Sequence, residues 1–143
     1  KNHAGVLSSD PLNHAMMVRE REEKVQRVAE YIPELKVDGP QSGKLLVVGW
    51  GGTYGHLLSA VQEVRAEGAE VSFAHFDYIM PLPKNTREVF EKFDRILVCE
   101  LNNGHFVNYL RGVMPQFGYE QFNKVQGQPF LVQEIVGAIK EQL

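Results

Sequence analysis

A glycine-rich segment that follows an apolar run is the first place in this sequence where residue spacing suggests chemistry. Gly49, Gly51 and Gly55 form the pattern G-x-G-x-x-x-G. A dinucleotide-binding loop has its last glycine one position earlier, where this chain has Tyr54, and an acidic residue about twenty positions further on, roughly where Asp77 stands. The pattern is compatible with a nucleotide site or with an anion at a helix N-terminus. It is also what a tight turn between closely packed elements requires.

Cys99, Glu100 and His105 form a second group, at the end of another apolar run. A thiol near a helix N-terminus has a lowered pKa and a histidine can serve as its base, which would indicate a cysteine hydrolase. A free cysteine at the end of an apolar strand is also commonly buried. Glu100, for its part, is stabilised if it faces helix amides, where it would bind loop backbone or cap the next helix. Both interpretations remain open at this point.

Several other chemistries lack the residues that they need. The five histidines show no H-x-x-x-H or H-x-H spacing and there is one cysteine, so a zinc site is not expected. P-loop, G-x-S-x-G and paired-glutamate patterns are missing. Asn102 and Asn103 alone do not make the G-D-G…N-N motif that binds thiamine diphosphate and magnesium. We therefore predict no catalytic, cofactor-binding or metal-binding residue.

Composition describes an ordinary globular domain. The 143 residues are 43% hydrophobic, enough for one core. A net charge of -3 argues against a nucleic-acid partner, and no apolar run reaches the roughly 20 residues of a membrane span. The single cysteine suits a reducing cytoplasm. The first residues form no signal peptide and include no initiator Met, so we expect a fragment of a longer cytoplasmic protein.

The elements that must position these residues alternate between strand and helix. Buried strands are predicted where apolar runs are continuous, and helices where apolar residues recur every three or four positions. Alternation of this kind implies a parallel sheet with helices on both faces. The expected strands are 35–37, 44–48, 69–76, 95–99 and 119–123, and the expected helices after the first are one from Gly55 to before Gly68, 86–93, 105–113 and 131–143.

The amino-terminal region reads differently. Residues 1–12 are expected to be a linker from an absent upstream domain, and 13–143 to form the folded domain. Asn13 is the predicted N-cap of a first helix that Pro33 ends. That helix has a charged face, expected to be solvated. Its apolar stripe consists of Met16, Met17, Val25, Val28, Ala29 and Ile32.

Four segments resemble one protein family. Leu45–Gly55 is similar to the first strand and loop of the last domain of 2-oxoacid:ferredoxin oxidoreductase α subunits. Val98–His105 resembles that domain's P-E-x-N-x-G-Q stretch, with Cys99 and His105 in place of its proline and glutamine. Asn123–Phe130 resembles its N-K-x-x-G-x-P-F signature. Asp10–His14, with Met17 and the charged helix, resembles the segment leading into the domain. The resemblance covers almost the whole chain, and the 2-oxoglutarate type is the most similar.

The resemblance implies a three-layer α/β/α sandwich of the transketolase carboxy-terminal type. Its sheet would be mostly parallel and five-stranded, with one antiparallel edge strand, for which residues 35–37 are the candidate. The family decarboxylates a 2-oxoacid oxidatively with coenzyme A and passes electrons through iron–sulfur clusters to ferredoxin. Thiamine diphosphate and magnesium are held by an upstream pyrimidine-binding domain and the β subunit. This domain would bind no cofactor and would be inactive alone.

An assembly role is the function that these implications favour. The glycine loop, the Glu100 loop and the turn at 126–130 are expected to pack on the upstream domain or the β subunit, with large aromatic residues as anchors. Phe130 could instead fill the core. A nucleotide- or coenzyme A-binding module and a Cys99-dependent hydrolase remain as alternatives. The candidate interface residues are Trp50, Gly51, Gly52, Thr53, Tyr54, Gly55, Glu100, Asn102, Asn103, Gly104, Gly127 and Phe130.

Overall fold

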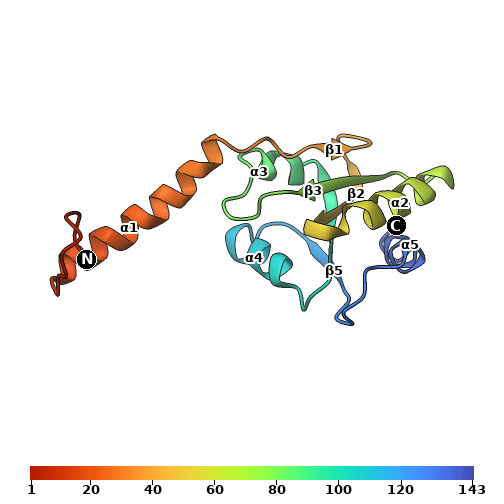
Figure 1. The fold of residues 1–143 in the computed structure, drawn as a ribbon. Coiled ribbons are helices and arrows are strands. Elements are labelled where there is room, and N and C mark those ends of the chain that lie inside the picture. Colours follow the sequence, from red (N-terminus) through yellow and green to blue (C-terminus); the bar gives the residue numbers. More distant parts are fainter.

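A five-stranded sheet organises the chain, and the computed structural model describes all residues from 1 to 143. The spatial order of the strands is β1-β3-β2-β4-β5 (Figure 1). β1 runs antiparallel to β3, and the other neighbouring pairs are parallel. The predicted mostly parallel sheet with one antiparallel edge strand is confirmed. The strands are β1 (Val37–Asp38), β2 (Gly43–Trp50), β3 (Val71–Phe76), β4 (Phe93–Glu100) and β5 (Tyr119–Asn123).

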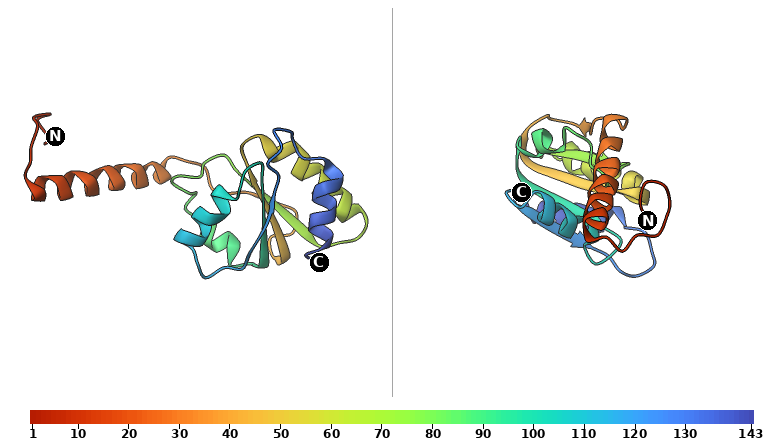
Figure 2. Two further views of the ribbon diagram at one scale, coloured as in Figure 1. Left: turned by 90° about the horizontal axis from the view of Figure 1, so that it is seen from below. Right: turned by 90° about the vertical axis from the view of Figure 1, so that its left-hand side faces the viewer.

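Four helices cover the two faces of this sheet. α2 and α5 lie together on one face, and α3 and α4 lie on the other (Figure 2). The predicted three-layer sandwich is therefore present. The helices are α2 (Tyr54–Ala66), which follows a 3₁₀ turn at Gly51–Thr53, α3 (Thr86–Phe90), α4 (His105–Val113) and α5 (Val132–Lys140).

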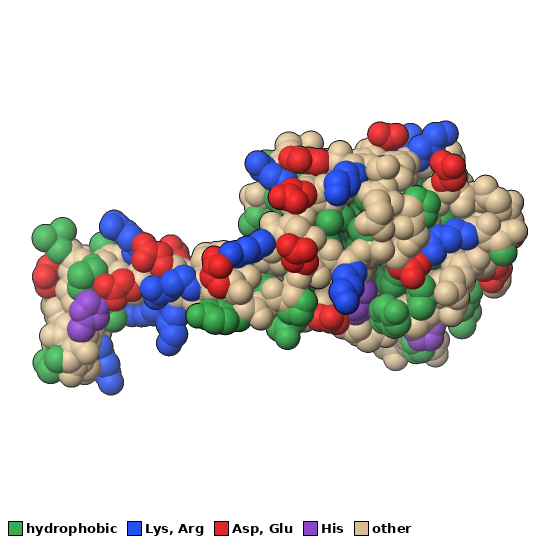
Figure 3. Space-filling model, turned by 90° about the horizontal axis from the view of Figure 1, so that it is seen from above, with side chains coloured by type: hydrophobic (Ala, Val, Ile, Leu, Met, Phe, Trp, Pro, Cys, Tyr) green, Lys and Arg blue, Asp and Glu red, His purple; other side chains and the backbone are tan.

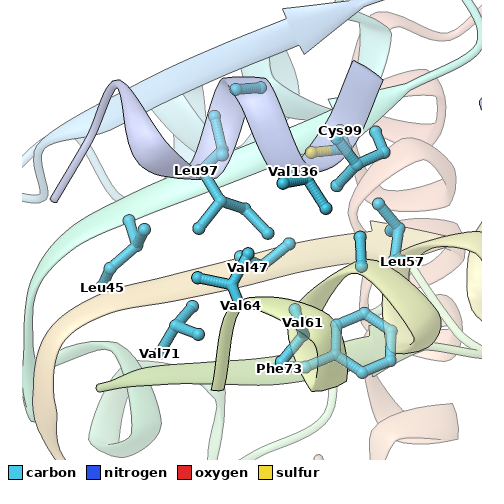
Figure 4. Packing of buried hydrophobic residues seen from close by; sticks show 14 of the residues in the cluster. Leu45, Val47, Leu57, Val61, Val64, Val71, Phe73, Leu97, Cys99 and Val136 are labelled. Carbon is cyan, nitrogen blue, oxygen red and sulfur yellow. The ribbon is translucent and has the colours of Figure 1, made fainter. Parts of the chain in front are cut away.

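Burial on both faces explains the continuous apolar run of β2. Leu45 and Val47 face the α2/α5 layer, and Leu46 and Val48 face the α3/α4 layer. Each of these side chains is at most 1% exposed. Figure 4 shows Leu45 and Val47 in the first of the two cores, with Val136 of α5 on one side and Val61 and Val64 of α2 on the other. The strand pattern of a two-sided parallel sheet is thus explained by the packing.

The predicted end of the helix that begins at Thr86 is wrong. The helix expected at 86–93 ends at Phe90, and Phe93 begins β4 instead. Phe93 pairs with Gly43 at the start of β2, and Lys92 accepts a hydrogen bond from the Gly43 amide through its carbonyl at 3.0 Å. Pairing with a neighbouring strand outweighs the local helical pattern at this point.

The first helix begins earlier than predicted. α1 (Pro11–Arg27) is followed by a 3₁₀ turn at Val28–Glu30. Asp10, not Asn13, is the N-cap, and its Oδ1 accepts a hydrogen bond of 2.9 Å from the amide of Leu12. Pro11 at the first helical position suits this start, because its missing N–H has no partner to lose there. The helix therefore starts inside the segment predicted to be a linker.

α1 projects away from the sandwich and packs on none of its layers (Figures 1 and 2). None of its residues is buried. The apolar stripe predicted from Met16, Met17, Val25, Val28, Ala29 and Ile32 therefore has no covering element in this chain, with Val25 40% and Val28 46% exposed. None of the helices is both long enough and apolar enough to span a membrane.

Phe130 gives a direct test of the α2/α5 core. The ring is 1% exposed and lies 5.6 Å from that of Phe122, so we expect Phe130→Ala to lower the free energy of unfolding by about 3–5 kcal/mol. Leu131→Ala is the matched control, because Leu131 is 63% exposed and its loss should change little. Urea unfolding followed by circular dichroism measures both. Equal midpoints for the two variants would contradict the packing.

Candidate functional site

The loops that follow β2 and β4 meet at the carboxyl-terminal edge of the sheet. Trp50 ends β2 and Glu100 ends β4, and the Trp50 Nε1–H donates to Glu100 Oε2 at 3.3 Å. The order of strands reverses between β2 and β4, which is where open α/β sheets commonly bind ligands. In this chain a hydrogen bond between two side chains spans that position.

Glu100 is fully buried and its two oxygens are bound by the start of α4. Oε2 accepts from the Phe106 amide at 2.8 Å, and Oε1 accepts from the Val107 amide at 2.9 Å. Asn102 Oδ1 accepts from the amides of Gly104 and His105, each at 2.8 Å. The first turn of α4 thus has its N–H groups satisfied within the chain. The capping interpretation of Glu100 is confirmed.

Gly104 is required by this arrangement. Its φ of 82° lies in the left-handed region, which favours glycine. A Cβ at this position would also lie 3.0 Å from Val107 Cγ1 and 3.2 Å from Asn123 Nδ2. The predicted Asn102–Gly104 segment is therefore built for the turn into α4, and only Asn103 of this segment is exposed.

The glycine loop contains two kinds of glycine. A Cβ at Gly49 would lie 2.1 Å from Leu57 Cδ1 and 2.7 Å from Thr53 Oγ1, so this glycine lets α2 pack on β2. Gly51 has a φ of 61°. Gly52 and Gly55 have neither a positive φ nor a neighbour within 4 Å of an added Cβ. Packing inside this chain therefore explains Gly49 and Gly51, but it does not explain the other two glycines.

Contacts within the chain fix both ends of the turn at 126–130. Lys124 is buried and its Nζ lies 2.8 Å from Glu134 Oε2 on α5. The hydrogen bond from Lys124 lowers the pKa of Glu134, and a second one from the Leu131 amide acts in the same direction. Phe130 lies in the core, so its expected place as an exposed anchor is wrong for this chain, while Gly127 is exposed.

The candidate interface residues therefore separate into an interior group and a surface group. The loops at 50–55 and 100–105 are brought together, but many of their side chains serve the fold. Trp50 and Asn102 are half-buried. Buried members are Thr53, Glu100, Gly104 and Phe130, and exposed members are Gly51, Gly52, Tyr54, Gly55, Asn103 and Gly127.

Cys99 is a core residue. Its side chain is 0% exposed, and Figure 4 shows the sulfur pointing into the α2/α5 core near Val136. Burial raises the pKa of the thiol, and the adjacent Glu100 carboxylate raises it further. His105 is exposed at the start of α4. Because a nucleophile requires an accessible thiolate, this geometry excludes the hydrolase interpretation.

A cleft of about 760 Å³ lies beside the glycine loop, between the segment 33–38, the first turn of α2 and the end of β3. Tyr54 contributes one wall, with its ring centroid 5.2 Å from that of His75. Burial lowers the pKa of His75, while the Asp77 carboxylate and a backbone hydrogen bond at Gly51 act in the opposite direction. His75 was not among the predicted site residues. A histidine inside a largely apolar strand, two residues before Asp77, was the available signal.

No group of three or more His, Cys, Asp or Glu side chains is placed to hold a metal ion. A second, smaller pocket of about 130 Å³ lies on the other side of Trp50, against Phe106 and Tyr109. Its walls are almost entirely apolar. The cleft at Tyr54 is therefore the place where polar groups and open volume coincide.

Replacing Glu100 tests its capping role. Glu100→Gln puts an NH₂ group against amide donors, so we expect a loss of about 1–3 kcal/mol in the free energy of unfolding. Because Trp50 is the sole tryptophan, its emission should also shift when its partner changes. Glu120→Gln, at an exposed position on β5, is the control. Unchanged stability and emission in Glu100→Gln would show that the contacts with Trp50 and α4 contribute little.

Alkylation tests the burial of Cys99. We expect iodoacetamide to leave the native chain unmodified and to add one carbamidomethyl group after unfolding in guanidinium, because the thiol is enclosed and protonated. Intact mass spectrometry reads both states. Stoichiometric labelling of the native chain would contradict the core assignment.

Comparisons with known proteins agree with this fold. No protein-family model matches the chain. The chain is 36% identical over 143 residues to the 2-oxoglutarate oxidoreductase subunit KorA of Mycobacterium tuberculosis, covering 99% of this chain and 21% of that protein. It is 32% identical over 104 residues to subunit alpha of 2-oxoacid:ferredoxin oxidoreductase 1 of Aeropyrum pernix, covering 68% of this chain and 16% of that protein. The chain thus spans about a fifth of these relatives.

Solved structures give the same result. The 2-oxoglutarate:ferredoxin oxidoreductase from Magnetococcus marinus, with 2-oxoglutarate, coenzyme A and succinyl-CoA bound, superposes with a TM-score of 0.85 and 26% identity over 96% of this chain and 24% of that chain. A split-gene transketolase, an inactive β4 tetramer, superposes with a TM-score of 0.59 and 14% identity over 77% of this chain and 41% of that one, which shows the shared fold. The chain therefore belongs to the 2-oxoacid:ferredoxin oxidoreductase α-subunit family and corresponds to the carboxy-terminal part of those subunits.

Proposed function

We propose that this chain is the assembly domain of the α subunit of a thiamine-diphosphate-dependent 2-oxoacid:ferredoxin oxidoreductase, of the 2-oxoglutarate type. The intact enzyme would oxidatively decarboxylate the oxoacid to an acyl-CoA and reduce ferredoxin in the cytoplasm. The identity to KorA and the superposition on the Magnetococcus marinus enzyme support the family and the type.

The cofactors of such an enzyme would lie outside this chain. The sequence lacks the G-D-G…N-N motif that binds thiamine diphosphate and magnesium. Iron–sulfur clusters need several thiolates, and the chain has a single buried cysteine. We infer that the upstream pyrimidine-binding domain and the β subunit bind these groups.

The uncovered helix α1 is the observation that carries the assembly role. A lone helix of its 17 residues is marginal in water, because most helix stability in proteins comes from packing of an apolar face. Of the stripe, Met16, Val25 and Val28 are exposed, and Met17, Ala29 and Ile32 are half-buried. Figure 3 shows hydrophobic side chains between charged ones on the projecting arm. We infer that the rest of the α subunit or the β subunit covers this stripe.

The exposed residues of the strand-end loops extend the proposed contact surface. Tyr54 is 52% exposed, and Gly51, Gly52 and Gly55 present bare backbone next to it. Bare backbone allows close approach by a neighbour, and a large aromatic ring beside it suits an interface anchor. Asn103 and Gly127 are further exposed positions of the predicted set.

Changing the stripe of α1 tests the proposal. In the full-length α subunit produced with its β subunit, we expect Val25→Gln with Val28→Gln to increase dissociation of the complex about tenfold or more. Loss of two packed apolar side chains accounts for an effect of this size. Size-exclusion elution and the rate of ferredoxin reduction measure the outcome.

Glu23→Gln with Arg27→Gln is the control, because these residues lie on the charged face of the same helix and their joint change leaves the net charge as it was. This control should assemble normally. The proposal fails if the valine variant elutes as an intact complex and reduces ferredoxin at the normal rate.

A further inference from the structure

Aromatic side chains on the α3/α4 side of the sheet form the floor of the smaller pocket. Trp50 is fixed by its hydrogen bond to Glu100, and its ring lies edge-on to that of Phe106, with centroids 6.3 Å apart. Phe106 is itself buried, and Tyr109 stacks on it with a centroid distance of 6.4 Å. Packing within the chain therefore holds this floor in place, and the pocket of about 130 Å³ is preformed.

The loop after β3 forms the opposite wall of this pocket. Ile79 and Met80 line it, and the prolines at 81 and 83 restrict the backbone that carries them. Met80 is nevertheless 69% exposed, although it is an apolar side chain beside an apolar pocket. Water in such a pocket finds few hydrogen-bond partners, so an apolar group that replaces the water is favoured.

The volume of the pocket suits one large apolar side chain. An apolar cavity of about 150 Å³ can bind benzene, so a pocket of about 130 Å³ accepts the ring of a phenylalanine or the branched end of a leucine. Aromatic pockets that receive one such side chain are typical hot spots of protein interfaces. This pocket therefore fits a protein neighbour that inserts a single apolar side chain.

The segment that connects α1 to β1 is fixed next to the wall of this pocket. The amide of Leu35 donates to Asn85 Oδ1 at 2.8 Å, and Asn85 Nδ2 donates to the Leu35 carbonyl at 2.9 Å. Glu30 forms an ion pair with Lys84 in the same loop. α1 leaves the sandwich on the side where α4 and the loop after β3 lie (Figures 1 and 2). A body attached to the far end of α1 therefore lies on the same side as the pocket.

An α subunit of this family has most of its length ahead of the region that matches this chain. If they are compact, the roughly 540 preceding residues that a coverage of 21% implies have a radius of gyration of about 24 Å. The 17 residues of α1 have a similar length at about 1.5 Å per residue, so such a body reaches the edge of the sheet. Because the two parts are covalently connected, their contact does not cost the translational and rotational freedom that a separate subunit loses.

We propose that the pocket between Trp50, Met80 and Tyr109 holds one large apolar side chain from the part of the same α subunit that precedes α1. This contact fixes the sandwich on the preceding part of the chain, next to the covalent connection through α1. The inference rests on the proposed function, because it names the neighbour that covers this surface of the assembly domain.

Hydrogen peroxide footprinting of the intact complex, full-length α subunit with its β subunit, tests the contact. Peroxide transfers one oxygen atom to an accessible thioether, which gives methionine sulfoxide and water. We expect Met80 to oxidise at least about tenfold more slowly in the native complex than in the complex unfolded in urea. Met114, 7% exposed, is the internal reference for a buried methionine. Peptide mass spectrometry measures the rates.

Met16, on the stripe of α1, separates the two proposals in the same experiment. Protection of Met16 reports that α1 is covered, and protection of Met80 reports that the pocket is covered. Oxidation of Met80 at its unfolded rate while Met16 is protected would overturn the pocket contact and leave the proposed function standing.

Two charge variants test the pocket itself. His105→Asp places a carboxylate on the exposed rim, at a helix start that tolerates it, and burying that charge weakens docking. We therefore expect Met80 to oxidise about tenfold faster in this variant. Asn108→Asp adds a like charge at an exposed position of α4 outside the pocket and should behave as the parent does. Equal rates in the two variants would contradict the contact.

A photo-crosslinker identifies the occupant. With benzoylphenylalanine at position 80 in the complex, we expect light to form a link to a peptide from the preceding part of the same chain, so that the α subunit keeps its own mass on a denaturing gel. The same crosslinker at position 143 is the control, because Leu143 is 47% exposed near the start of β4, and it should form no such link. A link from position 80 to the β subunit or to a second α subunit, or the absence of any link, would overturn the proposal.

Discussion

The buried carboxylate of Glu100 sets the geometry at the working edge of this sheet. A charge removed from water is tolerated only when hydrogen bonds replace its hydration. Three donors do so here: the amides of Phe106 and Val107 and the indole of Trp50. One side chain thereby fixes the end of β2, the end of β4 and the start of α4 relative to one another. At the topological switch point between β2 and β4, this chain has a hydrogen-bonded junction. The open cleft lies to one side of this junction, at Tyr54.

Much of the fold followed from patterns in the sequence. The two-sided apolar run of β2, the glycine at 49 that α2 packs against and the turn-forming glycine at 104 could all be recognised in the sequence. Three features were harder to predict from the sequence: the direction of the Cys99 side chain, the burial of Phe130 and the cleft around His75. Each depends on which distant element packs against the residue. Asp10 displaced Asn13 as the cap because both are good capping residues, and the proline at 11 favoured the earlier start.

The residues that carry the family resemblance are mostly structural in this domain. Lys124 is tied to Glu134, Phe130 fills the α2/α5 core, and Asn102 forms the turn before α4. A sequence signature of this kind identifies residues that maintain the fold. It explains how a chain can match oxidoreductase subunits over almost its entire length while its own polar groups are occupied by folding. The exposed positions lie within the same segments, between the structural residues: they are Gly51, Gly52, Tyr54, Gly55, Asn103 and Gly127.

The projecting helix also has a mechanical meaning. With 17 residues and a rise of about 1.5 Å per residue, α1 is a rod about 25 Å long. None of its residues is buried, so its angle to the sandwich depends on the short segment around Pro33 and on the ion pair between Glu30 and Lys84. A partner that binds the amino-terminal end of α1 would therefore also influence the orientation of the sandwich. A small change in the angle of α1 would correspond to a larger displacement at the sheet.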